Sequence, residues 1–319
     1  MKTRLAIAGT LCALIALIFS TEAMMASARA ALDVCCRVIL PSLFPFFVLS
    51  NLLSRLGLPA RLGKLLAAPA GKLFGVSGSG VTALIVGLTG GYPLGAAYIA
   101  DMVSGGSVSR EEGQRLLSFC NNSGPAFLIG AVGGGVFHSA RIGLLLYVSH
   151  ALAAVLTGVL TRKNAVLREP ETASFPDTPF SHAFPEAVKQ AVGSVLAVCG
   201  FVVCFTVLVG LLDSHGLFSL FAGALSARTG LELHAARALL IGTLEIGSAV
   251  GSMQGISPTP LQLAVTAGIL GWGGLSVHCQ TAAVLSESDL SLKGHTLGRL
   301  LSAVFSFFLV RFGAGLLSF

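Results

Sequence analysis

Long apolar runs, each interrupted by a short polar or glycine-rich phrase, dominate the pattern of the chain. Runs of this length predict membrane-spanning helices, because about 20 apolar residues in a helix cross the hydrocarbon core of a bilayer. A membrane β-barrel would instead show short segments of alternating hydrophobicity. The expected apolar segments are 5–20, 33–55, 79–103, 126–137, 142–161, 188–212, 217–226, 236–254, 261–286 and 296–317.

Composition supports the bilayer as the solvent for most of this chain. Apolar residues make up 54% of the 319 positions and charged residues only 11%. A soluble domain usually carries about 25% charged residues, so this chain has too few charges to coat a water-exposed surface. Backbone groups in lipid must satisfy one another within helices. The predicted fold class is therefore all-α, a polytopic transmembrane helix bundle.

The N-terminal segment allows two interpretations. Lys2 and Arg4 precede an apolar run that ends near Ser20, and Ala-x-Ala phrases follow near residue 30, as in a cleaved signal peptide. An uncleaved first span explains the same residues in a polytopic chain, and we expect an N-terminal transmembrane helix within 1–32. Basic residues lie in short connections such as 55–72, as the positive-inside rule requires. They form no cluster interleaved with aromatics, so we expect no nucleic-acid partner.

Two related halves flank a polar linker at 162–183, with a first repeat at 33–161 and a second at 184–319. Matching landmarks recur at a nearly constant offset. Gly57 corresponds to Gly216, and the phrase at 121–123 corresponds to the one at 276–278. Repeated membrane halves with interrupted helices at matching positions are typical of secondary transporters.

Interruptions inside apolar helices are the second feature that indicates a site. The first half is broken at Gly90–Gly95 and again at 119–125, and the second at Glu245–Ser248 and 271–280. Backbone groups freed at such breaks are costly in lipid unless they face protein, water or a ligand. Half-helix N-termini aimed at a common point would favour an anion.

The path of segment 79–103 decides the relation between the halves. A re-entrant hairpin that folds back at Gly90–Gly95 leaves three crossings in each half and gives inverted repeats, whereas a full crossing leaves four and gives parallel repeats. We favour the hairpin. Two further local predictions are a kinked or unwound helix at Pro41 and Pro45 and a capping box formed by Ser109 and Glu112.

Candidate binding residues lie at these interruptions. Asn121, Asn122 and Ser123 offer donors and acceptors without charge, and Glu245 places a carboxylate within an apolar helix, where it is a candidate coupling or gating group. The other candidate substrate-binding residues are Gly91, Tyr92, Pro93, Ser248, Gly273, Gly274, Ser276, His278 and Gln280. Each group has a structural alternative: a helix cap, an ordinary turn, a water-facing helix end for the glutamate, or a hydrogen-bonded buried histidine.

Signatures of enzymes and metal sites are lacking in the sequence. No phosphate-binding loop, HExxH, GxSxG or paired acidic motif occurs, so we expect neither an enzyme nor a cofactor. Seven cysteines are present and none forms a CxxC pair, which argues against a metal site or a disulfide framework.

Four phrases of the chain also resemble a known family. They are LPSLFPFFVLSNLL (40–53), GLTGGYPLGAAYIAD (87–101), EEGQRLLSFCNNSGPAFLIGAVG (111–133) and GWGGLSVHCQTAAVL (271–285). They resemble the YlbJ-type sporulation integral membrane proteins, which belong to the wider nucleoside-recognition or Gate membrane domain group. The resemblance covers about 33–310 and makes the two repeats Gate-like.

This resemblance implies a polytopic membrane protein of spore formers, linked to moving dipicolinic acid across a forespore membrane. Broader relatives are nucleoside-transporter-like proteins with re-entrant hairpins. We therefore expect a transporter or permease for a small organic anion, with dipicolinate as the substrate that the resemblance suggests. A non-transporting scaffold of sporulation membranes and a nucleoside-type transporter are the alternatives. The oligomeric state, a homo-oligomer included, stays open.

Overall fold

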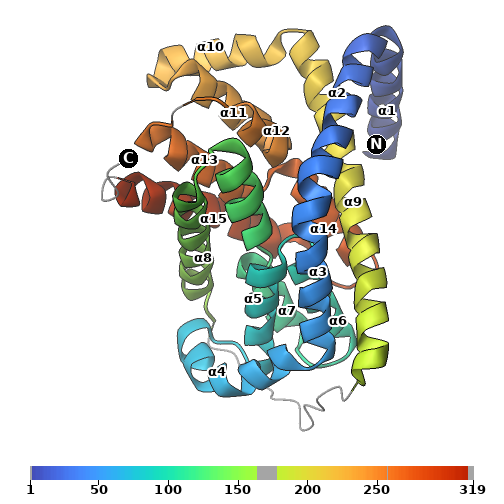
Figure 1. The fold of residues 1–319 in the computed structure, drawn as a ribbon, viewed down its shortest axis with the longest axis vertical. Coiled ribbons are helices and arrows are strands. Elements are labelled where there is room, and N and C mark those ends of the chain that lie inside the picture. Colours follow the sequence, from blue (N-terminus) through green and yellow to red (C-terminus); the bar gives the residue numbers. More distant parts are fainter. Residues whose placement is uncertain (1, 164–177, 257, 315–319) are drawn as a thin grey trace.

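The computed structural model describes residues 2–163, 178–256 and 258–314, and the described residues form helices and no strand. The all-α prediction is confirmed (Figure 1). The helices are α1 (Lys2–Phe19), α2 (Thr21–Val34), η1 (Cys35–Ile39), α3 (Leu40–Arg55), α4 (Leu58–Phe74), α5 (Gly78–Gly90), α6 (Leu94–Ser104), α7 (Arg110–Phe119), η2 (Ala126–Val136), α8 (Ala140–Leu160), α9 (Phe180–Ser214), α10 (Leu217–Thr229), α11 (Leu233–Leu244), α12 (Ile246–Gly251), α13 (Pro260–Trp272), α14 (Gly274–Leu285) and α15 (Leu292–Gly313).

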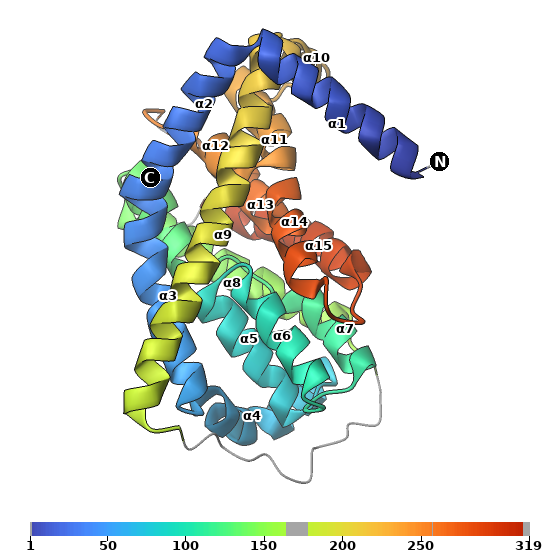
Figure 2. The ribbon, with the colours of Figure 1, turned by 90° about the vertical axis from the view of Figure 1, so that its right-hand side faces the viewer.

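Two long helices run antiparallel along one side of the molecule (Figures 1 and 2). The first is the continuous stretch Thr21–Arg55, made of α2, η1 and α3, and the second is α9; each has 35 residues. Their pairing is antiparallel because Cys35 near the middle of the first contacts Cys199, while Arg55 at its end donates to Gln190. Each helix rises about 52 Å at 1.5 Å per residue and can cross a bilayer.

Pro41 and Pro45 do not end the first long helix, and the unwinding expected there takes the form of a π-helical turn, η1, which ends at Ile39, two residues before Pro41. A proline ring clashes with the carbonyl four residues earlier, and a local π turn rearranges that hydrogen bond without ending the helix. The boundary that we expected near residue 32 lies inside this helix, and the chain turns at Ser20 instead.

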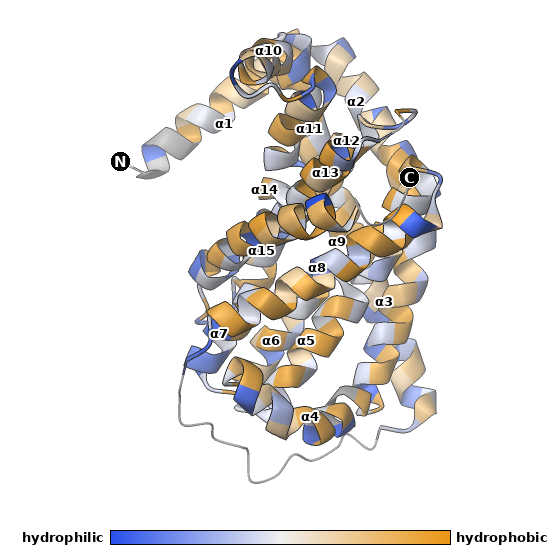
Figure 3. Cartoon of the chain, turned by 90° about the vertical axis from the view of Figure 1, so that its left-hand side faces the viewer, coloured by the Kyte–Doolittle hydropathy of each residue, from blue (hydrophilic) through white to orange (hydrophobic). Residues whose placement is uncertain are grey.

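Helix α1 projects away from the bundle beyond the turn at Ser20 (Figure 2). Its apolar part is short, and Ile7, Leu14 and Phe19 are exposed. Large apolar side chains are also exposed on the outer faces of α8, α9 and α15, where they would contact lipid (Figure 3). Five helices in the described residues are long and apolar enough to cross a membrane, or six if the bent pair α4–α5 is one span.

Helices α4 and α10 follow the two long helices at opposite ends of the molecule (Figure 1). Both begin after a left-handed glycine, Gly57 or Gly216, and both end at another, Gly75 or Gly230. A left-handed residue at a helix end favours glycine because glycine has no Cβ. These matched positions support the predicted repeat, and the antiparallel long helices support its inverted form. The repeat itself stays a prediction.

Helices α5 and α6 fold back on each other as a hairpin. The Thr82 hydroxyl lies 3.1 Å from the Tyr98 hydroxyl, so the outer parts of the two helices are in contact. Near the tip, a Cβ at Gly95 would lie 3.1 Å from the Cα of Gly87. The chain turns between them at residues 91–93. Of the two paths considered for segment 79–103, the structure has the hairpin.

The expected capping box at α7 forms only on one side. The Ser109 hydroxyl accepts from the Glu112 amide at 3.1 Å, as predicted. The Glu112 carboxylate turns away and accepts from the amide and hydroxyl of Ser77 at the start of α5. Tertiary contact between α7 and α5 therefore offers this carboxylate two donors, where the local motif would offer one. The predicted linker 162–183 lies mostly outside the described residues, and α9 begins at Phe180.

Candidate functional site

The two helix breaks of each half lie against each other. A Cβ added to Gly91 at the α5–α6 tip would lie 2.8 Å from the nitrogen of Gly124. A Cβ added to Gly274, which begins α14, would lie 2.9 Å from the oxygen of Leu244, beside the break at Glu245. Gly91 has φ 82° and Gly274 has φ 72°, conformations that favour glycine. Close backbone contact and left-handed geometry together explain glycine at both positions.

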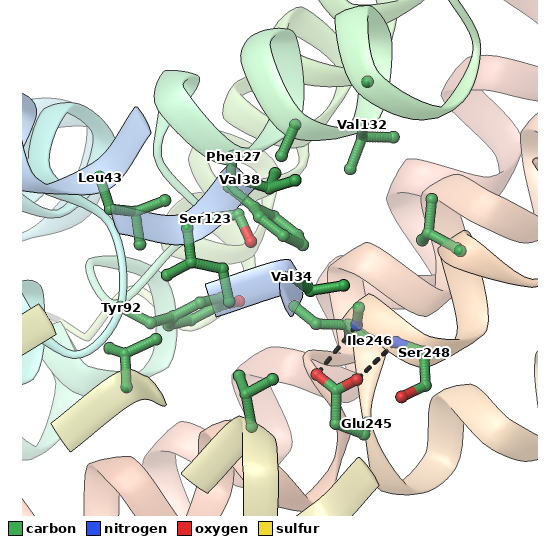
Figure 4. A pocket seen from close by; sticks show the side chains of 18 of the residues that line it. Val34, Val38, Leu43, Tyr92, Ser123, Phe127, Val132, Glu245, Ile246 and Ser248 are labelled. Atoms are coloured by element: carbon green, nitrogen blue, oxygen red, sulfur yellow. Dashed lines mark hydrogen bonds between the residues drawn. The ribbon is translucent and has the colours of Figure 1, made fainter. Parts of the chain in front are cut away.

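A cavity of about 460 Å³ lies where these pairs of breaks meet (Figure 4). Gly90–Tyr92 and Ser123–Gly124 come from the first half, and Glu245–Ser248 with Gln280 from the second. The long helices α2–η1–α3 and α9, together with η2, supply most of the remaining wall. The breaks that the sequence places far apart therefore share one cavity.

Most of this wall is apolar, with a few polar groups aimed at it. Small aliphatic side chains such as Ala31, Val132 and Val202 cover much of the surface. The polar side chains of the wall are Tyr92, Ser123, Thr206, Glu245, Ser248, Gln254 and Gln280. Pockets for small molecules commonly have a volume of about 300–1,000 Å³ and this balance of apolar surface and sparse polar groups.

Glu245 stands at the break between α11 and α12. Its backbone is extended, with φ −146° and ψ 122°, and its side chain is 2% exposed. The carboxylate accepts from the amide of Gly247 at 2.9 Å and of Ser248 at 2.5 Å (Figure 4). The Ser248 hydroxyl lies 3.1 Å from the Thr206 hydroxyl on α9. This buried carboxylate is thus satisfied by the backbone that the break frees, and it remains on the cavity wall.

Tyr92 and Asn122 both accept hydrogen bonds from one arginine. Arg299 of α15 is fully buried and donates to the Tyr92 hydroxyl at 2.8 Å and to the Asn122 Oδ1 at 3.0 Å. The Asn122 Nδ2 donates to the carbonyl of Phe119 at 2.8 Å. Asn122 is fully buried and lies behind the cavity wall. It therefore fixes one break of the first half to the last helix of the second.

Asn121 links different elements. Its Oδ1 accepts from the amide of Ala96 in α6 at 3.2 Å, and its Nδ2 donates to the Thr281 hydroxyl in α14 at 3.0 Å. Ser123, the next residue but one, does line the cavity, and its amide donates to the Nε2 of His150 at 3.1 Å. Within the Asn-Asn-Ser phrase, only the serine therefore faces the cavity.

The remaining predicted residues divide in the same way. Gly91, Ser248 and Gln280 line the cavity, whereas Pro93, Gly273, Gly274, Ser276 and His278 lie outside its wall. Ser276 accepts from the Gln280 Nε2 at 3.3 Å and so contacts a residue of the wall. The His278 ring packs on Trp272, with ring centroids 4.3 Å apart, and on His295, at 4.9 Å.

Sequence reasoning missed Arg299 and His150. Both are buried and ionisable, and both lie within predicted membrane spans, 296–317 and 142–161. The rule that singles out Glu245, that an ionisable group inside a span is a candidate functional residue, applies equally to them. The described residues contain no cluster of three or more His, Cys, Asp or Glu side chains able to hold a metal ion.

Fold and site together define a multi-pass membrane protein with a mostly apolar cavity beside its helix breaks. A curated relative, the sporulation integral membrane protein YlbJ of Bacillus subtilis (strain 168), is 32% identical over 311 residues. The alignment covers 89% of this chain and 76% of that protein. The chain therefore belongs to the YlbJ family of sporulation integral membrane proteins. No protein-family model and no solved structure matches it.

Proposed function

We propose that this protein is a permease for a small organic anion, and that dipicolinate is its substrate in a forespore membrane. The observation that carries the proposal is the cavity lined in part by helix breaks from both halves. Transporters with internal repeats bind substrate near the membrane midplane, where discontinuous helices meet. Membership of a sporulation membrane family supplies the cellular setting for dipicolinate.

The chemistry of the cavity wall fits a small aromatic anion. Apolar side chains from η2 and the long helices would cover the faces of an aromatic ring. Hydroxyl and amide groups of Tyr92, Ser123 and Gln280 could donate hydrogen bonds to carboxylate oxygens. Glu245 would then be the coupling or gating group, because an anion entering the cavity would approach this carboxylate.

Flux into vesicles tests the proposal directly. Purified protein is reconstituted into vesicles that contain terbium, whose luminescence rises when it chelates dipicolinate. The wild type is expected to admit dipicolinate faster than protein-free vesicles. Equal rates in both would refute the permease assignment for this substrate and favour the scaffold, and uptake of a nucleoside alone would favour the nucleoside-type transporter.

Filling the cavity provides the matching structural test. Val202 of α9 lines the cavity, and Val202→Trp should reduce dipicolinate flux at least tenfold because the indole would occupy the substrate volume. Val192→Trp is the matched control, since Val192 lies on the same helix and is exposed at its surface. Equal flux in the two variants would show that substrate does not pass through this cavity.

A further inference from the structure

Arg299 is a fully buried cation without a carboxylate partner among the described residues. Ion pairs such as Arg37–Asp33, Lys189–Glu186 and Arg237–Asp213 lie elsewhere and do not include Arg299. The guanidinium contacts only neutral acceptors, and its Nε has no hydrogen-bond partner. A buried charge without a counter-charge is strongly unfavourable. A charged residue retained inside a membrane protein is therefore a candidate functional residue.

The buried carboxylates of the described residues have partners of their own. Glu112 accepts from the amide and hydroxyl of Ser77. Glu245 accepts from the amides of Gly247 and Ser248. Neither carboxylate is within salt-bridge distance of Arg299, so its charge has no negative side chain in contact with it.

Three histidines surround Arg299 and supply no negative charge either. His150, His278 and His295 are buried and close enough to interact electrostatically with the guanidinium. The Nε2 of His150 accepts from the Ser123 amide, so that nitrogen carries no proton and the ring is neutral. The region behind Tyr92 therefore carries the positive charge of Arg299. Protonation of a neighbouring histidine would add to that charge.

Tyr92 connects this positive charge to the cavity. Its hydroxyl accepts from Arg299, whose guanidinium carbon lies 5.8 Å from the centroid of its ring, and the same residue lines the cavity. Asn122 accepts from the other guanidinium nitrogen and precedes Ser123, another residue of the wall. A hydroxyl that accepts from a cation is polarised and becomes a stronger donor in a low-dielectric interior.

We infer that Arg299 is the positioning residue that makes the cavity select anions over neutral molecules of the same shape, by holding its uncompensated charge behind Tyr92 and Asn122. The inference rests on the proposed permease function and adds the origin of its charge selectivity. An anion bound against Tyr92 would provide the counter-charge that no described carboxylate provides in contact with Arg299. An uncharged molecule of the same shape would not gain this charge–charge attraction to Arg299.

The experiment compares uptake of dipicolinate with uptake of its uncharged diamide, pyridine-2,6-dicarboxamide, in reconstituted vesicles. Arg299→Gln should lower the anion-to-neutral uptake ratio at least tenfold, whereas Arg299→Lys, which keeps the charge, should retain most of it. Arg311→Gln is the control, because Arg311 is an exposed residue of the same helix. A defect in packing alone would reduce uptake of both solutes and leave the ratio unchanged.

Asn122→Asp provides a second variant in case Arg299→Gln does not fold. It places a carboxylate of nearly the same shape 3.0 Å from the guanidinium and neutralises the charge while keeping Arg299. We expect the uptake ratio to fall at least tenfold here as well. An unchanged ratio in a folded Asn122→Asp or Arg299→Gln protein would overturn the inference. Wild-type vesicles that admit neither solute would instead refute the proposed function.

Discussion

The two pairs of helix breaks share a backbone plan and differ in where their charge lies. In the first half, Gly91 packs on Gly124, and the wall that they form is neutral. In the second half, Gly274 packs beside Glu245, which carries a carboxylate on the cavity wall. The positive charge associated with the first-half breaks comes from Arg299 on α15, behind Tyr92.

Similar backbone breaks can therefore lie beside charges of opposite sign, the Glu245 carboxylate in the second half and the Arg299 guanidinium in the first. The second-half break satisfies its freed amides with its own glutamate, so its polar groups are occupied. The first-half break leaves Tyr92 and Ser123 on the wall and obtains support from a distant helix. We therefore expect Tyr92 and Ser123 of the first half, with Gln280, to recognise the substrate and Glu245 of the second half to respond to it.

Removing the charge of Glu245 should have the largest effect on function. Glu245→Gln is expected to lower dipicolinate flux at least tenfold, because one amide would face an NH₂ group and the charge on the wall would be lost. Glu112→Gln is the matched control, since Glu112 is also a buried carboxylate that accepts two hydrogen bonds, from the amide and hydroxyl of Ser77, but lies off the cavity. Flux per folded protein should be near the wild-type value for Glu112→Gln. Equal loss in both variants would contradict a special role for Glu245.

The backbone contacts of Gly91 and Gly274 within the two pairs of breaks predict that a methyl group at either glycine lowers stability. Gly91→Ala and Gly274→Ala should each cost about 2–4 kcal/mol, because a left-handed residue is strained and the Cβ meets backbone atoms. Gly255→Ala is the control: Gly255 has φ 79°, but its Cβ would meet nothing within 4 Å. Thermal unfolding in detergent measures all three. Equal midpoints would show that the backbone contacts between the breaks contribute little.

A smaller effect is expected for the link between α6 and α14. Asn121 donates to Thr281, and both side chains are buried away from the cavity wall. A double-mutant cycle with Asn121→Ala and Thr281→Val should give a coupling free energy of about 0.5–1.5 kcal/mol. The anion-to-neutral uptake ratio should stay constant throughout the cycle. A change in that ratio would mean that Asn121 contributes to recognition and not only to packing.

Sequence patterns predict the all-α membrane fold class and the positions of the helix breaks well, because both depend on composition over short stretches. Apolar runs define the helices, and glycine, proline and buried polar residues mark Gly91–Pro93 and Glu245 as interruptions. The hairpin is the favoured path for segment 79–103, and three of the four breaks, together with Gln280 beyond the fourth, line one cavity.

The direction of each side chain could not be predicted in this way. Asn121 and Asn122 face away from the cavity because their side-chain amides hydrogen-bond to Thr281 of α14 and Arg299 of α15. No local sequence pattern contains those partners. The same holds for Glu112, which binds Ser77 across helices. Pro41 is tolerated through a π turn, a local rearrangement that the presence of proline alone does not specify.

Native cysteines lie in the wrong places to report on the cavity. Cys120 is fully buried, Cys279 is exposed, and neither lines the cavity. A probe therefore has to be introduced at the wall, in a background in which the exposed thiols Cys12, Cys36, Cys204 and Cys279 are replaced by alanine.

Substrate protection of such a probe tests the central claim most directly. Ser123→Cys and Ser248→Cys place a thiol on the first-half and second-half walls, and Leu196→Cys on the outer face of α9 serves as the control. Dipicolinate is expected to slow methanethiosulfonate labelling at both cavity positions and to leave the control unchanged. Labelling at positions 123 and 248 that is indifferent to dipicolinate would contradict a substrate site between the two pairs of breaks.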